Sequence, residues 1–117
     1  MVGELSGVVL DTADPETLAN FYSELLGLPI TRVDGGWIEI QHGTWRLCFQ
    51  EAPKHRPPRW PDAAFPQQFH LDIRVDDIDE AEKQVLDMGA TLLSTDEPGF
   101  RVYADPSGHP FCLEYQD

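Results

Sequence analysis

The sequence of 117 residues predicts an α+β fold built from two similar βαβββ modules. Three landmarks recur along the chain: a strand-like stretch that ends at an aspartate, a glycine that closes a helical pattern, and a short apolar strand. The pairs are Gly7–Asp14 with His70–Asp77, Gly27 with Gly89, and Arg46–Gln50 with Pro110–Glu114. Each pair is separated by 62 to 64 residues, so the spacing indicates an internal repeat.

The first module, about residues 1–51, begins with a strand and then a helix. Asp14 can cap the helix, Pro15 suits its first position, and Gly27 ends it. Between these signals, apolar residues recur at helical spacing. Alternating patterns predict the strands of this module at Glu4–Thr12, Leu28–Val33, Trp37–Gln41 and Trp45–Gln50.

The second module, about residues 67–117, repeats the order. Asp77 followed by Glu80 resembles a capping box, and Gly89 closes the helix. The expected strands are Gln68–Val75, Thr91–Ser94, Phe100–Ala104 and Pro110–Tyr115.

Residues 52–66 join the modules and hold five of the ten prolines, a composition that continues neither a helix nor a strand. A linker of this length is often functional. Each half is too short to be stable alone, so residues 1–117 are expected to form a single domain with a shared core.

The charge excludes several classes of partner. Eight basic against 21 acidic residues give a net charge of −13, whereas nucleic acids and anionic membranes require basic surfaces. No apolar stretch approaches the roughly 20 residues of a membrane helix, and the N-terminus lacks a basic signal-peptide start. Two cysteines are too few for a disulfide scaffold. We therefore expect a cytoplasmic protein.

Alternation along the strands places polar side chains on the face opposite the helices. A polar face of this kind can meet solvent, or two such faces can enclose a small-molecule site. The side chains expected to converge are those of Cys48, His70, Arg74, Cys112 and Glu114.

Each candidate has a functional and a structural interpretation. His70 can act as a ligand or general base, or as a hydrogen-bonding residue in a vestigial site. Cys48 and Cys112 can be small buried apolar residues, zinc ligands or a redox pair. Glu114 can serve as a catalytic carboxylate or pair with an arginine.

The arginine and tryptophan side chains and the basic segment likewise have both a functional and a structural interpretation. Arg74 can bind an anionic group or balance Asp72. Trp37 and Trp60 can stack on a planar ligand or serve only in packing. The basic segment Lys54–Trp60 can form a lid or a solvated linker.

Three stretches resemble the vicinal oxygen chelate superfamily, which includes glyoxalase I, bleomycin-resistance proteins and extradiol dioxygenases. They are LDTADPETLANFYSELLG at Leu10–Gly27, HLDIRVDDIDEAEKQVLDMGA at His70–Ala90 and ADPSGHPFCLE at Ala104–Glu114. Together with the repeat, the resemblance covers nearly the whole chain. Within the superfamily, the sequence most resembles the small glyoxalase-like proteins. It implies paired βαβββ modules forming an open barrel around a cleft, and a homodimer.

Metal-using members of the superfamily place ligands on the first and last strand of each module. Those positions fall here on Gly7, Cys48, His70 and Cys112. Glycine cannot act as a side-chain ligand, and two positions carry thiols, so the divalent-metal site of the family is expected to be degenerate. A Cys48–His70–Cys112 set would suit zinc with an open fourth position.

The sequence therefore predicts a small-molecule-binding protein of the glyoxalase/bleomycin-resistance type that sequesters or recognises an aromatic or polar compound without a required cofactor. The residues expected to bind it are Trp37, Gln50, Trp60, His70, Asp72 and Arg74. The alternative is a metal-dependent lyase or isomerase of glyoxalase type in which His70 and Glu114 are catalytic; a zinc ion held by cysteine and histidine is one form of its metal site.

Overall fold

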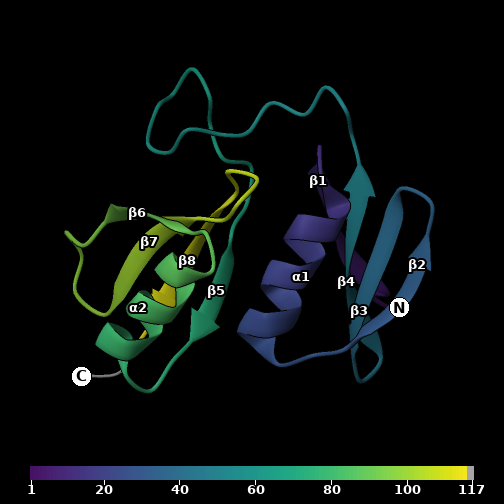
Figure 1. Ribbon diagram of the computed structural model, residues 1–117, viewed down its shortest axis with the longest axis horizontal. Coiled ribbons are helices and arrows are strands. Elements are labelled where there is room, and N and C mark those ends of the chain that lie inside the picture. Colours follow the sequence, from purple (N-terminus) through teal and green to yellow (C-terminus); the bar gives the residue numbers. More distant parts are fainter. Residues whose placement is uncertain (116–117) are drawn as a thin grey trace. The chain divides into compact units, whose positions relative to one another are not determined.

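The computed structural model describes residues 1–115; the last two residues of the predicted second module lie outside the described part. The chain forms two compact units that divide between His55 and Arg56, inside the predicted linker. Each unit contains one helix and one four-stranded mixed sheet, and neither sheet closes into a barrel (Figure 1). The predicted α+β fold of two similar modules is confirmed.

The sheet of the first module has the strand order β1-β4-β3-β2. Its strands are β1 (Gly7–Thr12), β2 (Ile30–Asp34), β3 (Trp37–His42) and β4 (Trp45–Glu51). β1 pairs with β4 in parallel, and the other neighbours are antiparallel. Helix α1 (Pro15–Leu26) covers one face, where Tyr22 stacks on Phe49 with ring centroids 5.8 Å apart.

The predicted ends of α1 are confirmed. Asp14 accepts a hydrogen bond from the backbone N–H of Thr17 at 3.1 Å, and Pro15 opens the helix. Gly27 ends it with φ of +67°, a left-handed conformation that glycine adopts without strain. The N–H of Leu28 then donates to the carbonyl of Ser23, so Leu28 completes the cap and β2 starts two residues later than predicted.

The sheet of the second module repeats the topology in the order β5-β8-β7-β6. Its strands are β5 (Leu71–Arg74), β6 (Thr91–Ser94), β7 (Phe100–Ala104) and β8 (Pro110–Glu114), and α2 (Ile78–Asp87) covers one face. β5 and β8 are parallel, whereas β8 and β7 are antiparallel. Beneath α2, Tyr103 and Phe111 are fully buried and stacked.

The side chains of β7 alternate between the two faces of this sheet. Arg101 and Tyr103 point to α2: Arg101 lies 3.0 Å from Asp79 and 3.2 Å from Glu82, and the Tyr103 hydroxyl donates to Glu82 at 2.9 Å. The intervening positions therefore project from the face that α2 leaves uncovered.

β5 is shorter than the predicted Gln68–Val75. Its pairing with β8 begins at Leu71, opposite Phe111. β8 itself begins at Pro110, which has no N–H to donate to a neighbouring strand, so the ladder stops there. Within the described residues, no helix is long and apolar enough to cross a membrane.

Candidate functional site

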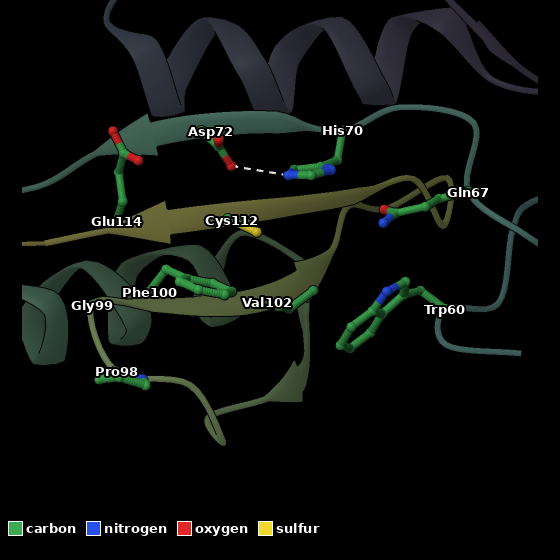
Figure 2. A pocket seen from close by; sticks show the side chains of 10 residues that line it. All are labelled: Trp60, Gln67, His70, Asp72, Pro98, Gly99, Phe100, Val102, Cys112 and Glu114. Carbon is green, nitrogen blue, oxygen red and sulfur yellow. Dashed lines mark ion pairs between the residues drawn. The ribbon is translucent and has the colours of Figure 1, made fainter.

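A pocket of about 390 Å³ lies in the second module, on the face of the sheet opposite α2 (Figure 2). Three strands and two connecting segments contribute to it. Its lining consists of Trp60, Gln67, His70, Asp72, Pro98, Gly99, Phe100, Val102, Cys112 and Glu114.

One side of the pocket is apolar. Phe100 and Val102 project from β7, Pro98 precedes that strand, and Trp60 comes from the segment before β5 (Figure 2). Trp60 therefore contacts the same cavity as strand residues about 40 positions later in the chain.

Local contacts hold the segment that carries Trp60. The backbone N–H of Arg59 donates to the carbonyl of Phe65 at 2.7 Å, and the guanidinium lies 4.7 Å from the centroid of the Phe65 ring. Pro57 packs so closely on the Asp105–Gly108 turn that a Cβ at Gly108 would lie 2.5 Å from the Cβ of Pro57. These contacts stabilise the loop on the rest of the second module.

The other side of the pocket is polar. Nε2 of His70 lies 3.1 Å from Oδ1 of Asp72 (Figure 2). Asp72 on β5 is the direct strand partner of Cys112 on β8. Burial raises the pKa of the Cys112 thiol to about 11, helped by the charge of Asp72, by the hydrogen bond between them and by the charge of Glu114. The thiol is therefore protonated at neutral pH in the metal-free protein.

Of the two charged residues predicted on the same strand face, Glu114 and Arg74, only Glu114 reaches the pocket. Glu114 lines the pocket and lies 3.6 Å from the guanidinium of Arg74. Arg74 itself does not line the pocket; its exposed side chain borders a separate shallow hollow near the start of α2. The predicted pairing of Glu114 with an arginine is thus observed.

Trp37, Gln50 and Cys48 lie in the first module. Trp37 and Gln50 are strand partners, and the Trp37 indole N–H donates to Glu39 at 2.6 Å. Cys48 is buried; burial, followed by the charge of Glu39, raises the pKa of its thiol. A binding role for these residues stays a prediction.

Gly7 stands at the first-strand ligand position that the resemblance implies. A Cβ built there would lie 2.6 Å from the carbonyl oxygen of Arg46. Because any side chain would clash with β4, this position cannot supply a metal ligand.

The second module holds a different set of donors that fits a metal ion. One ligand atom from each of His70, Asp72 and Cys112 lies within 4.8 Å of the other two. Imidazole, carboxylate and thiolate groups together suit zinc, which binds nitrogen, oxygen and sulfur in tetrahedral sites. The sequence had predicted two of these three residues as metal ligands, and Asp72 only as a ligand-binding residue.

Sequence reasoning predicted Trp60 as a ligand-binding residue but missed the rest of the apolar side of the pocket. Phe100 and Val102 were predicted to lie in a strand, but no face was assigned to them. The signal was available: the turn at Asp105–Gly108 makes β7 and β8 a hairpin, in which Val102 opposes Cys112 and Phe100 opposes Glu114. Gln67 and Pro98 lie in segments without periodicity, so no pattern indicated them.

The comparisons with known proteins agree with this fold. The family described as Glyoxalase-like domain matches residues 7–114. A comparison with curated protein sequences finds no match.

Three solved structures illustrate the similarity of fold. A glyoxalase/bleomycin resistance protein/dioxygenase family enzyme from Burkholderia phytofirmans PsJN has 17% identity and a TM-score of 0.78, covering 97% of this chain and 98% of that chain. A possible glyoxalase from Bacillus cereus has 13% identity and a TM-score of 0.72, covering 97% and 99%. A fosfomycin resistance protein from Listeria monocytogenes has 14% identity and a TM-score of 0.73, covering 100% and 94%.

At these identities the solved structures establish a common fold, whereas the family match covers nearly the entire chain. The repeat, the two βαβββ modules and this match lead to one conclusion. The chain belongs to the glyoxalase-like domain family, within the vicinal oxygen chelate superfamily.

Proposed function

We propose that the protein binds a small organic molecule with a planar apolar part in the pocket of the second module, and so sequesters or recognises that compound. The observation that carries the proposal is the pocket itself. Its volume of about 390 Å³ falls in the range of ligand sites, and it combines an apolar side with a few polar groups, as such sites do.

The polar groups favour one class of ligand. Asp72 and Glu114 line the pocket, whereas none of the lysines and arginines in residues 1–115 does. The whole chain also carries a net charge of −13, which repels anions. A neutral or cationic aromatic compound with hydrogen-bond donors therefore fits better than a carboxylate or a phosphonate.

Trp60 and Phe100 would contact the apolar part of such a ligand. Aromatic side chains supply a large contact area and stack on planar rings. Because Trp60 comes from the loop before β5, that loop would cover part of the bound molecule.

The test uses 2,3-dihydroxynaphthalene, a neutral planar diol, with 2-naphthoate as its anionic counterpart. Calorimetric titrations are run with EDTA present, so that binding does not depend on a metal. We expect saturable binding of the diol, at least about tenfold weaker binding of the carboxylate, and loss of diol binding in Trp60→Ala.

Trp45→Ala is the matched control, since Trp45 is a half-exposed tryptophan of the first module. It should leave the affinity for the diol unchanged. Equal binding by both compounds, or by Trp60→Ala and the parent chain, would overturn the proposal.

The second candidate is a metal-dependent lyase or isomerase of glyoxalase type, and the observation that favours it is the His70–Asp72–Cys112 group. A bound divalent metal would polarise a substrate oxygen. In this candidate Glu114, which lines the same pocket, would move the proton, and the role of Arg74 would be to hold that carboxylate.

Two further features belong to the proposal. We expect a homodimer, since the edge strand β2 exposes Ile30 and Val33. Light scattering that returns 13.2 kDa, the mass of one chain, would contradict this. We also expect a cytoplasmic location, in keeping with the two free cysteines, which cell fractionation tests.

A further inference from the structure

We propose that His70, Asp72 and Cys112 form a zinc site whose three protein ligands all come from the second module. The resemblance implies ligands shared between modules, with Gly7 and Cys48 at two of the positions, and Asp72 at none. The zinc site requires no organic ligand, and the binding of an organic ligand is tested without metal. Either proposal can therefore fail while the other stands.

The strand register places Asp72 beside Cys112, and His70, one residue before β5, points to the same side (Figure 2). His70 and Asp72 are two residues apart and project to the same side of the chain, and Asp72 is the direct partner of Cys112. β8 is an interior strand of the sheet and Cys112 is buried, which makes the sulfur the anchored member. The side chains of His70 and Asp72 are 38% and 55% exposed, so they can adjust around an ion.

The distances suit a tetrahedral ion. Zinc bonds of about 2.0 Å to nitrogen and oxygen and about 2.3 Å to sulfur place neighbouring ligand atoms roughly 3.3 to 3.5 Å apart. In the protein, the His70 and Asp72 atoms are 3.1 Å apart, and all three ligand atoms lie within 4.8 Å of one another. Small side-chain rotations therefore suffice to bring the three to bonding distance.

The donor types select the metal. A thiolate favours zinc over magnesium and calcium, which bind oxygen ligands. Three protein ligands leave one coordination position for water or a ligand atom, as in catalytic rather than structural zinc sites. On binding, the ion takes the place of the Cys112 thiol proton, which is released to solvent.

The first module provides a control within the same chain. Cys48 occupies the equivalent position on β4 and is also buried, but its parallel-strand partner is Val9 instead of an aspartate. Gly7 stands where the repeat places His70. Cys48 does face Glu39 on β3, but it lacks the histidine and the parallel-strand aspartate that accompany Cys112.

The test replaces zinc by cobalt, whose bond to a thiolate gives a near-ultraviolet charge-transfer band. The full chain is purified without a metal-affinity tag, stripped with EDTA, freed of chelator and titrated with cobalt chloride. We expect the band to saturate near one ion per chain and to disappear when zinc is added. It should be absent in Cys112→Ser and present at full intensity in Cys48→Ser.

His70→Ala and Asp72→Asn should each weaken zinc binding, measured by equilibrium dialysis, by about tenfold or more. Far-ultraviolet circular dichroism checks that every variant is folded, and Cys112→Ala replaces Cys112→Ser if the serine variant is not. A band that survives in Cys112→Ser, a band lost in Cys48→Ser, or no band in the parent chain would overturn the proposal. Unchanged zinc affinity in Asp72→Asn would remove Asp72 from the site.

Discussion

Asp72 on β5 and Cys112 on β8 are direct partners in a parallel strand pair, and the charge of Asp72 adds to burial in raising the pKa of the Cys112 thiol. The equivalent pair in the first module is Val9 and Cys48. The parallel-strand neighbour is thus acidic beside Cys112 and apolar beside Cys48, whose acidic neighbour, Glu39, lies instead on β3. The reactivity of the two thiols should record this difference.

Replacing Asp72 with asparagine should make Cys112 more reactive in the metal-free protein. Burial contributes most to its raised pKa of about 11, and the charge and hydrogen bond of Asp72 come next. Removing that charge lowers the pKa, and each unit gives about tenfold more thiolate below it. We expect faster alkylation by iodoacetamide at a fixed mildly alkaline pH with EDTA present, measured by mass spectrometry of the Cys112 peptide.

The Cys48 peptide of the same sample is the internal control, because Cys48 lies in the other module. Its alkylation rate should not change. An unchanged or slower rate at Cys112 in Asp72→Asn would show that the carboxylate does not stabilise the protonated thiol.

Replacing Gly108 with alanine should disturb the pocket through the loop that carries Trp60. Gly108 has φ of +91°, and its Cβ would lie 2.5 Å from the Cβ of Pro57. The loop must move away, so we expect both a loss of stability in urea and weaker binding of 2,3-dihydroxynaphthalene.

Gly35→Ala separates backbone strain from this clash. Gly35 has φ of +61°, and a Cβ there would meet nothing within 4 Å. It should lose about 1 to 2 kcal/mol of stability from its left-handed backbone and keep its affinity for the diol. Equal effects of the two substitutions on diol binding would mean that the Pro57 contact does not position Trp60.

The hydrogen bond between Tyr103 and Glu82 should contribute to the attachment of α2 to its sheet. The Tyr103 hydroxyl donates to Glu82 at 2.9 Å, and the ring is fully buried. We expect a coupling energy of about 1 kcal/mol or more between Tyr103→Phe and Glu82→Gln in a double-mutant cycle of urea unfolding. If the two substitutions change the free energy of unfolding additively, the Tyr103 hydrogen bond contributes nothing, and Glu82 is positioned by its ion pair with Arg101 alone.

We propose that the two modules unfold together as one domain. Each unit has fewer than about 65 residues, a size at which an isolated core is marginal. Tryptophan fluorescence and far-ultraviolet circular dichroism should therefore report the same single transition in urea. Two separate transitions would mean that the modules are independent domains.

The sequence predicted the fold in some detail because its signals were local. Asp14 and Gly27 mark the ends of α1 through side-chain and backbone capping, which depend only on neighbouring residues. The ends of β5 depended instead on its partner: Pro110, far along the chain, stops the ladder, and no pattern near Gln68 indicates this.

The polar side of the pocket was predictable for a similar reason. Asp72, Cys112 and Glu114 lie on two strands whose apolar and polar residues alternate, and His70 continues that alternation one residue before β5. Of the apolar side, only Trp60 was predicted as a ligand-binding residue. Pro98, like Gln67, reaches the pocket from an irregular segment, and the path of such segments depends on tertiary contacts such as that of Pro57 with Gly108.

The most direct test of the central claim, that the second-module pocket binds the ligand, is a titration of the ¹⁵N-labelled protein with 2,3-dihydroxynaphthalene in EDTA, followed by ¹H–¹⁵N correlation spectra. The account predicts that the largest shifts belong to the backbone amides of Phe100, Val102 and Cys112 and to the indole N–H of Trp60. The indole signal of Trp45 should stay in place. Shifts confined to the first module, or no shifts at saturating diol, would contradict it.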